Sequence, residues 1–229
     1  MRKITFSQAT QEAMAETMAK DPTVFAMGED LARQGGIFGQ FKGLPQQFPG
    51  RLIDTPISET FIIGGGVGAA LAGARPVVDM HFADFIGVPM DEIFNQMAKV
   101  RYMFGGQAKV PLVLRAPDGS AGGGAADLLA KEGIEAEVID LITLSPWDKE
   151  TVLNSVKKTH RLCIVHEAVK QGGFGAEISA TVAEEAMEYL DAPILRYGAP
   201  FCPIPFAPTL EKMVKVVPEY LVKGIKGMF

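Results

Sequence analysis

The chain has 229 residues, a net charge of −5 and 48% hydrophobic residues, which is typical of a globular protein of one large or two small domains. The acidic charge argues against a nucleic-acid partner. The two cysteines, Cys163 and Cys202, match no metal spacing and indicate a reduced compartment. The uncharged run over 60–74 is too short for a membrane span. We therefore expect a soluble cytoplasmic protein without a leader peptide.

The first half of the chain predicts alternating helices and strands. Helices are expected over 5–19, from Ser58 onward and over 89–101, and strands over 23–27, 52–54, 74–82 and 110–115. Residues 35–43 read as a loop. Strands that alternate with helices predict βα units and a mainly parallel sheet.

The second half repeats this pattern with different residues. Helices are expected over 125–132, from an N-cap at Ser145 followed by Pro146, and over 177–189 and 210–217, with strands over 136–141, 162–167 and 193–197. Each half looks like part of an α/β domain whose inner edge is missing, and a glycine-rich stretch joins the two. Either another chain covers the exposed sheet edge or the sequence carries an internal deletion.

The stretch from Asp54 to Gly73 is the most informative part of the sequence. Ser58 is placed to cap a helix, and Glu59 then lies in its first turn beside a run of small apolar residues. A carboxylate against an apolar wall is partly desolvated and suits proton exchange with a ligand nitrogen near neutral pH. The alternative is that Glu59 only supports the N-terminus of the helix through its dipole.

The order of several motifs resembles a known family. The motifs are Met27-Gly-Glu-Asp30, Asp54-Thr-Pro-Ile-Ser-Glu59, Gly73-Ala-Arg-Pro76, Phe82-Ala-Asp-Phe85, Asp91-Glu-Ile-Phe-Asn-Gln96, Arg101-Tyr-Met-Phe-Gly-Gly106, Arg115-Ala-Pro-Asp-Gly119, Glu137-Val-Ile-Asp-Leu141, Leu144-Ser-Pro146, Val165-His-Glu167 and Gly172-Gly-Phe-Gly-Ala-Glu177. Together they resemble the beta subunit of the thiamine-diphosphate-dependent, decarboxylating component of 2-oxo acid dehydrogenase complexes, the pyruvate, branched-chain and acetoin dehydrogenase type. The match covers nearly the whole chain except residues 120–126.

The resemblance implies an α/β fold of two doubly wound modules of transketolase type. These would be a truncated pyrimidine-binding module over 1–119, a glycine-rich junction over 120–126 and a C-terminal module over 127–229. It also implies an oxidoreductase subunit in a heterotetramer with an alpha subunit and a second beta subunit. That assembly would decarboxylate pyruvate or a branched 2-oxo acid, or cleave acetoin, and pass the acyl group to a lipoyl carrier on a dihydrolipoyl acyltransferase.

The same resemblance implies site residues. Glu59 matches the catalytic glutamate that hydrogen-bonds the aminopyrimidine ring of thiamine diphosphate, and Ile57, His81 and Phe85 match other positions that line the pocket. From the residues alone, His81 and Phe85 could equally belong to the core. No metal ligand is expected on this chain, because the motif that holds Mg²⁺ and diphosphate lies on the alpha subunit in this family.

Three further motifs leave their roles open. His166-Glu167 resembles a family dipeptide with a structural or interface role, and His160 is expected at the surface. Residues 172–175 suggest either a phosphate cradle or a turn.

One family element has no counterpart in this sequence. After Arg115-Ala-Pro-Asp-Gly119 the family continues into a loop that carries the active-site histidine, and this loop is missing here. A non-catalytic assembly subunit or an inactive truncated form is therefore the alternative function. A one-chain transketolase-like enzyme is a third interpretation, which the missing diphosphate motif argues against.

Overall fold

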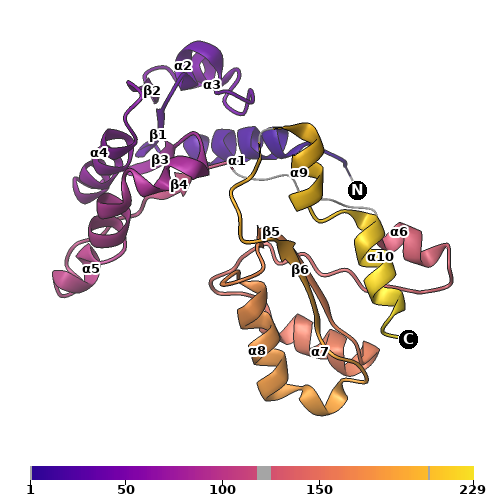
Figure 1. Cartoon of the computed structure of the whole chain (residues 1–229). Helices are drawn as coiled ribbons and strands as arrows, with labels where there is room; N and C mark the ends of the chain where they lie inside the picture. Colours follow the sequence, from indigo (N-terminus) through magenta and orange to yellow (C-terminus); the bar gives the residue numbers. More distant parts are fainter. Residues whose placement is uncertain (1, 118–124, 206) are drawn as a thin grey trace. The chain divides into compact units, whose positions relative to one another are not determined.

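The computed structural model describes residues 2–117, 125–205 and 207–229. The chain forms two compact units, Met1–Asp118 and Gly119–Phe229 (Figure 1). Most of the junction predicted over 120–126 lies outside the described residues. Its last two residues, 125 and 126, open the first helix of the second unit.

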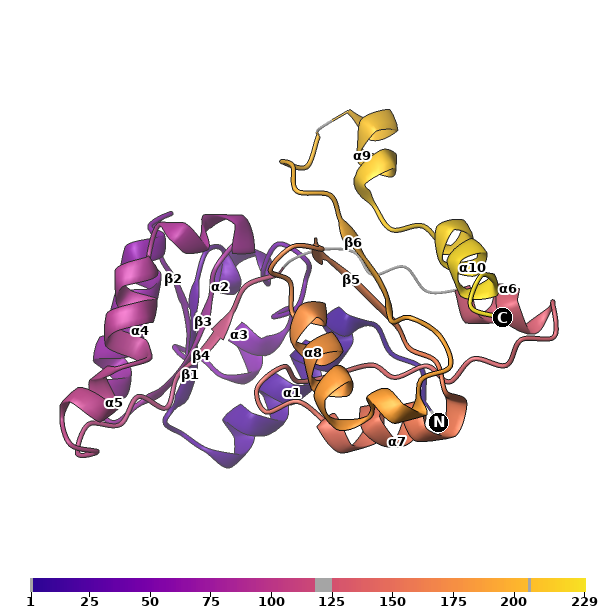
Figure 2. The same ribbon diagram turned by 60° about the horizontal axis from the view of Figure 1, so that its bottom comes forward.

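The first unit is built on a four-stranded, all-parallel sheet in the order β2-β1-β3-β4. In chain order its elements are α1 (Phe6–Lys20), β1 (Val24–Gly28), α2 (Leu31–Gln34), α3 (Leu44–Gln47), β2 (Leu52–Asp54), α4 (Glu59–Leu71), β3 (Arg75–Asp79), the 3₁₀ helix η1 (Ala83–Gly87), the π-helix η2 (Glu92–Met97), α5 (Val100–Met103) and β4 (Val113–Arg115). Figures 1 and 2 show α1 and α4 on opposite faces of this sheet.

Both faces of the sheet are buried, and the alternation along β1 explains how. Val24 and Ala26 belong to the core cluster on the α1 side, together with Met18. Met27, which points to the other face, packs in a second cluster with Ile62 of α4. Coverage of both faces is the usual condition of a parallel sheet.

The local signals of the first unit predict its elements well. Helix α1 begins at a capping box, in which the Gln8 amide donates to Thr5 Oγ1 at 3.2 Å and the Thr5 amide donates to Gln8 Oε1 at 2.9 Å. The strand expected over 74–82 is shorter, because pairing with β1 ends at Asp79. The helix expected over 89–101 is divided into η2 and α5, and the expected loop over 35–43 is flanked by the short helices α2 and α3.

The second unit has a parallel pair of strands, β5 (Cys163–Val169) and β6 (Leu195–Ala199). Its helices are α6 (Ala125–Ala130), α7 (Lys149–Thr159), α8 (Gly175–Glu185), the 3₁₀ helix η3 (Met187–Tyr189), α9 (Pro208–Val214) and α10 (Pro218–Lys226). Val156, Ile164 and Val182 form the centre of its core, and α10 packs against α6.

Two predictions for the second unit are wrong. Residues 136–141 join no sheet in the described part of the chain, although Ile139 and Leu141 pack on the core. A strand needs a neighbouring strand, and the ladders of this unit join only β5 to β6. The N-cap of α7 is Asp148 rather than Ser145, because the Asp148 carboxylate accepts from both the Thr151 amide at 3.0 Å and the Thr151 hydroxyl at 2.6 Å.

Two glycines of α4 provide a matched test of its packing. A Cβ at Gly66 would lie 2.4 Å from Val78 Cγ1 and 2.8 Å from Leu112 Cδ1, so Gly66→Ala should lower the free energy of unfolding by about 1–3 kcal/mol. A Cβ at Gly68 would meet nothing within 4 Å, so Gly68→Ala should raise it by up to about 1 kcal/mol through helix propensity. Urea unfolding followed by circular dichroism measures both, and equal effects would contradict this packing.

Candidate functional site

The candidate site lies where three adjacent parallel strands of the first unit end. Gly28 of β1 pairs with Asp54 of β2 and with Asp79 of β3, so all three strands stop in register. The Thr55 amide then donates to the Gly28 carbonyl at 2.8 Å, which holds the chain after β2 against the end of β1. In open α/β sheets the carboxyl ends of the strands are where ligands bind.

Helix α4 begins at this edge of the sheet. The Ser58 hydroxyl accepts a hydrogen bond from the Phe61 amide at 3.4 Å, as its predicted role of N-cap requires. Glu59 is the first residue of the helix and is half-buried. The side chain of Asp54 has a different task, since its carboxylate accepts from the Ala32 amide at 2.7 Å at the start of α2.

Two predicted pocket residues are large apolar side chains that stay exposed in the first unit. Ile57 is 80% exposed between β2 and α4, and Phe85 is 46% exposed in η1. These side chains are therefore not packed in the core of the first unit. Large apolar side chains left exposed at the ends of strands are available for contact with a ligand or a partner chain.

His81, the remaining predicted pocket residue, is buried. It is 3% exposed, and its ring lies edge-to-face with Phe38 at 6.3 Å and with Phe82 at 5.8 Å between centroids. Its Nε2 lies 3.2 Å from Asp79 Oδ2, and its Nδ1 is buried without a hydrogen-bond partner in the described structure. The Nε2 side of the ring therefore has a partner inside the protein, as in a core histidine, whereas the Nδ1 side has none in the described structure.

Asp79 is fully buried and accepts hydrogen bonds from three side chains. Arg115 Nη1 donates to Oδ1 at 2.5 Å, while Gln40 Nε2 at 3.1 Å and His81 Nε2 at 3.2 Å donate to Oδ2. Burial by itself would raise the pKa of Asp79, but the hydrogen bonds from His81 and Arg115 outweigh it and hold the pKa below its ordinary value. Asp79 is therefore a charged group inside the protein at neutral pH.

Glu29, directly after β1, has a raised pKa, in contrast to the lowered pKa of Asp79. Burial raises the pKa of Glu29, His81 lowers it, and the neighbouring carboxylates Glu59, Asp30 and Asp79 raise it further. One of its carboxylate oxygens, Oε1, is buried without a partner. The influence of Glu59 on this pKa places the two carboxylates in one electrostatic neighbourhood.

Sequence reasoning missed the network around Asp79. One signal was available, because Asp79 is the only charged residue in the apolar run over 76–80. Gln40 gave none, since it lies in a loop and meets its partner 39 residues later in the chain.

The histidine-glycine motifs of the second unit have a structural role. A Cβ at Gly173, Gly175 or Gly198 would lie within 2.8 Å of the His166 ring, and His166 Nδ1 donates to the Ala168 carbonyl at 2.9 Å. The glycines over 172–175 thus provide a turn and close packing around this ring, which favours the turn over a phosphate cradle. His160 is exposed at the end of α7, as expected.

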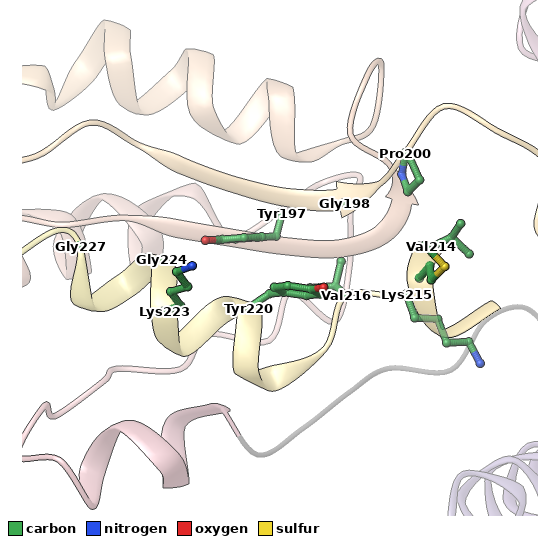
Figure 3. A pocket seen from close by; sticks show the side chains of 11 residues that line it. Tyr197, Gly198, Pro200, Val214, Lys215, Val216, Tyr220, Lys223, Gly224 and Gly227 are labelled. Carbon is green, nitrogen blue, oxygen red and sulfur yellow. The ribbon is translucent and has the colours of Figure 1, made fainter. Parts of the chain in front are cut away.

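A groove of about 470 Å³ lies beside β6 in the same unit (Figure 3). Tyr197 of β6 and Tyr220 of α10 line it, and Gly224 lets the two elements approach, since a Cβ there would lie 1.6 Å from the Tyr197 hydroxyl. Among the described residues no cluster of His, Cys, Asp and Glu could hold a metal ion. Within the same residues no helix is long and apolar enough to cross a membrane.

Comparison with known proteins gives the two units a family. Residues 2–128 match the family model "Transketolase, pyrimidine binding domain" and residues 124–220 match "Transketolase, C-terminal domain". Over 93% of both chains, the sequence is 32% identical to the acetoin:2,6-dichlorophenolindophenol oxidoreductase subunit beta of Cupriavidus necator. The chain belongs to the beta-subunit family of 2-oxo acid and acetoin dehydrogenases.

Other members of this beta-subunit family also match the chain along almost their whole length. The pyruvate dehydrogenase E1 component subunit beta of Rickettsia felis is 31% identical over 98% of each chain, and the 2-oxoisovalerate dehydrogenase subunit beta of Bacillus subtilis is 29% identical over 100% of this chain and 99% of its own. A solved split-gene transketolase, described as an inactive beta4 tetramer, superposes with a TM-score of 0.71 over 96% of this chain and 97% of its own; at 17% identity it shows the fold alone.

The comparison also shows that part of the family sequence has no counterpart here. The alignment with the Cupriavidus necator subunit runs over 315 positions, whereas the whole chain has 229 residues. The family to which the chain belongs thus confirms the expected α/β fold with transketolase-type modules. The roles of Ile57, Glu59, His81 and Phe85 stay predictions.

The raised pKa of Glu29 predicts a pH-dependent gain from Glu29→Gln. Because the folded protein disfavours the ionised carboxylate, wild-type stability falls, relative to the variant, as the pH rises from the ordinary value of 4.5 through the raised one. The variant should therefore be more stable than the wild type at pH 7 and equal to it well below pH 4.5. Thermal unfolding at both pH values measures this, with Glu16→Gln on the exposed face of α1 as the control. A difference that is the same at both pH values would contradict it.

Proposed function

We propose that the chain is the beta subunit of a thiamine-diphosphate-dependent 2-oxo acid or acetoin dehydrogenase, and that Glu59 binds the pyrimidine ring of the cofactor. The observation that carries this proposal is the half-buried carboxylate of Glu59 at the carboxyl edge of the sheet, in a unit that also leaves the apolar side chains of Ile57 and Phe85 exposed. A flat heteroaromatic ring with a basic nitrogen fits a carboxylate flanked by apolar side chains.

The residues of this edge fit the pyrimidine end of the cofactor. We assign Mg²⁺ and the diphosphate to an alpha subunit, because the motif that holds them lies on that subunit in this family, and the active site would then lie between chains. When bound, thiamine diphosphate supplies the carbanion chemistry of the reaction.

The chain's own contribution is orientation and proton control. Ser58 fixes the first turn of α4 and with it the position of Glu59. Glu59 then holds and returns a proton at the ring nitrogen, a role in which a positioned carboxylate is effective. Phe85 packs on the face of the ring, and Ile57 helps to exclude water from it. His81 is 3% exposed and is therefore less accessible to the ring than Ile57 or Phe85.

The names of the relatives support the substrate class. They are subunits of acetoin, pyruvate and 2-oxoisovalerate enzymes. We infer that the assembled protein decarboxylates a 2-oxo acid, or cleaves acetoin, and transfers the acyl group to a lipoyl carrier. Its partners would be the alpha subunit, a second beta subunit and a dihydrolipoyl acyltransferase, in the cytoplasm.

A second candidate is a non-catalytic assembly subunit. The observation that favours it is the length of the family alignment, 315 positions against 229 residues here. The missing part would include the loop with the active-site histidine. A chain without this loop could keep its subunit contacts and still be unable to turn over substrate.

Glu59→Gln separates the two candidates. The chain is co-purified with the alpha subunit encoded beside it, and thiamine-diphosphate-dependent dye reduction is measured with pyruvate, branched 2-oxo acids and acetoin. In an enzyme the variant should lose at least about a hundredfold in turnover, because the proton-transfer group is gone, while the complex still forms. Glu16→Gln is the matched control and should keep wild-type turnover.

Two other results would count against an active enzyme. A stable wild-type complex without turnover on any of the three substrates favours the assembly subunit. Failure of the wild-type chain to form a complex contradicts the beta-subunit proposal.

A further inference from the structure

Three buried polar atoms without hydrogen-bond partners lie at the ends of three neighbouring strands. They are Glu29 Oε1 after β1, Thr55 Oγ1 after β2 and His81 Nδ1 after β3. The pairing of Gly28 with both Asp54 and Asp79 brings these strand ends to one edge. Buried polar atoms are nearly always hydrogen-bonded, so each of these three atoms requires a partner from outside the chain.

The chemistry of the His81 nitrogens is fixed by Asp79. A carboxylate only accepts, so the contact of 3.2 Å between His81 Nε2 and Asp79 Oδ2 places a proton on Nε2. Gln40 Nε2 also lies 3.4 Å from His81 Nε2, but its hydrogen bond to Asp79 Oδ2 is shorter, at 3.1 Å, and the Gln40 Oε1 accepts from the Phe38 amide at 2.9 Å. In the neutral form of the ring, Nδ1 is therefore the acceptor nitrogen.

The three atoms thus form an acceptor-rich set. His81 Nδ1 accepts, ionised Glu29 accepts, and the Thr55 hydroxyl donates or accepts. A water molecule complements this set, because it can donate to the first two atoms and accept from the third. Internal waters typically make about three such bonds to polar groups that otherwise lack partners.

We propose that Glu29, Thr55 and His81 bind one internal water molecule, and that His81 is a positioning residue that orients the Glu29 carboxylate through this water. Asp79 and Arg115 support the arrangement, since they hold the His81 ring with Nδ1 free. The water site follows from the fold alone. Its consequence, that His81 and Thr55 set the charge of a carboxylate that acts on Glu59, rests on the proposed function.

The titration of Glu29 reports directly on this water. The groups that act on Glu29 electrostatically are His81, Glu59, Asp30 and Asp79. Because the water donates a hydrogen bond to the ionised carboxylate, its loss should shift the Glu29 titration to higher pH. The measurement is the carboxyl ¹³C chemical shift of Glu29 against pH in the full chain, without cofactor or partner.

Two pairs of variants separate the water from other causes. Thr55→Val and His81→Phe remove a partner of the water while they keep the size of the side chain, and each should shift the titration upward. Thr55→Ser and His81→Gln keep a polar atom at the same place and should titrate close to the wild type. His81→Gln also carries no charge, so a wild-type value in this variant excludes loss of a histidine charge as the cause.

The double variant Thr55→Val, His81→Phe decides whether one molecule joins the residues. If a single water is lost in either variant, the double variant should shift Glu29 no further than the larger single shift. Additive shifts, no shift in Thr55→Val, or equal shifts in His81→Gln and His81→Phe would each overturn the proposal.

Histidine nitrogen NMR provides a second, independent measurement. The chain has three histidines, and the signals of His81 are assigned by their loss in His81→Phe. A proton on Nε2 and none on Nδ1 at neutral pH is expected, and a proton on Nδ1 would overturn the proposal. None of these results depends on turnover, so an inactive complex would reject the proposed function and leave the water site standing.

Discussion

The buried carboxylate of Asp79 is the interaction on which the candidate site depends. It joins the loop that carries Gln40, the end of β4 at Arg115 and the imidazole of His81 in one hydrogen-bond network. A charge inside a protein is tolerated only when it is paired. Removing one partner of a buried ion pair destabilises the fold far more than replacing the whole pair by apolar residues. The network therefore ties the loop of Gln40 and the end of β4 to the end of β3.

Elements with local signals were predictable from the sequence, whereas elements that need a distant partner were not. The N-termini of α1 and α4 follow from Thr5 and Ser58, whose side chains accept hydrogen bonds from amides three residues later. Residues 136–141 carry a strand pattern but no neighbouring strand, so the pattern alone could not decide their structure. The N-cap of α7 is Asp148 rather than the expected Ser145, because the Asp148 carboxylate accepts from the Thr151 amide in the first turn of the helix.

The candidate site was predictable to a similar extent. Ile57 and Glu59 stood out because they belong to one motif, Asp54–Glu59, and Phe85 stood out as part of the separate motif Phe82–Phe85. The polar support behind them could not be seen as a network, because Gln40 lies in a loop and meets Asp79, at the end of β3, 39 residues later in the chain. Ile57 and Phe85 are exposed apolar side chains, and such side chains often mark a contact with a ligand or partner. Their exposure in the single chain therefore supports a site that another chain completes.

The ring of His166 occupies the space that a Cβ would need at any of three nearby positions, and all three positions are glycines. These glycines come from two segments that are separate in sequence, Gly173 and Gly175 around the start of α8 and Gly198 in β6. A side chain at any one of these three glycines would therefore clash with the His166 ring and disturb the second unit. In related chains, an alanine at any of the three glycine positions should be accompanied by a smaller residue in place of His166, so the four positions should vary as a set.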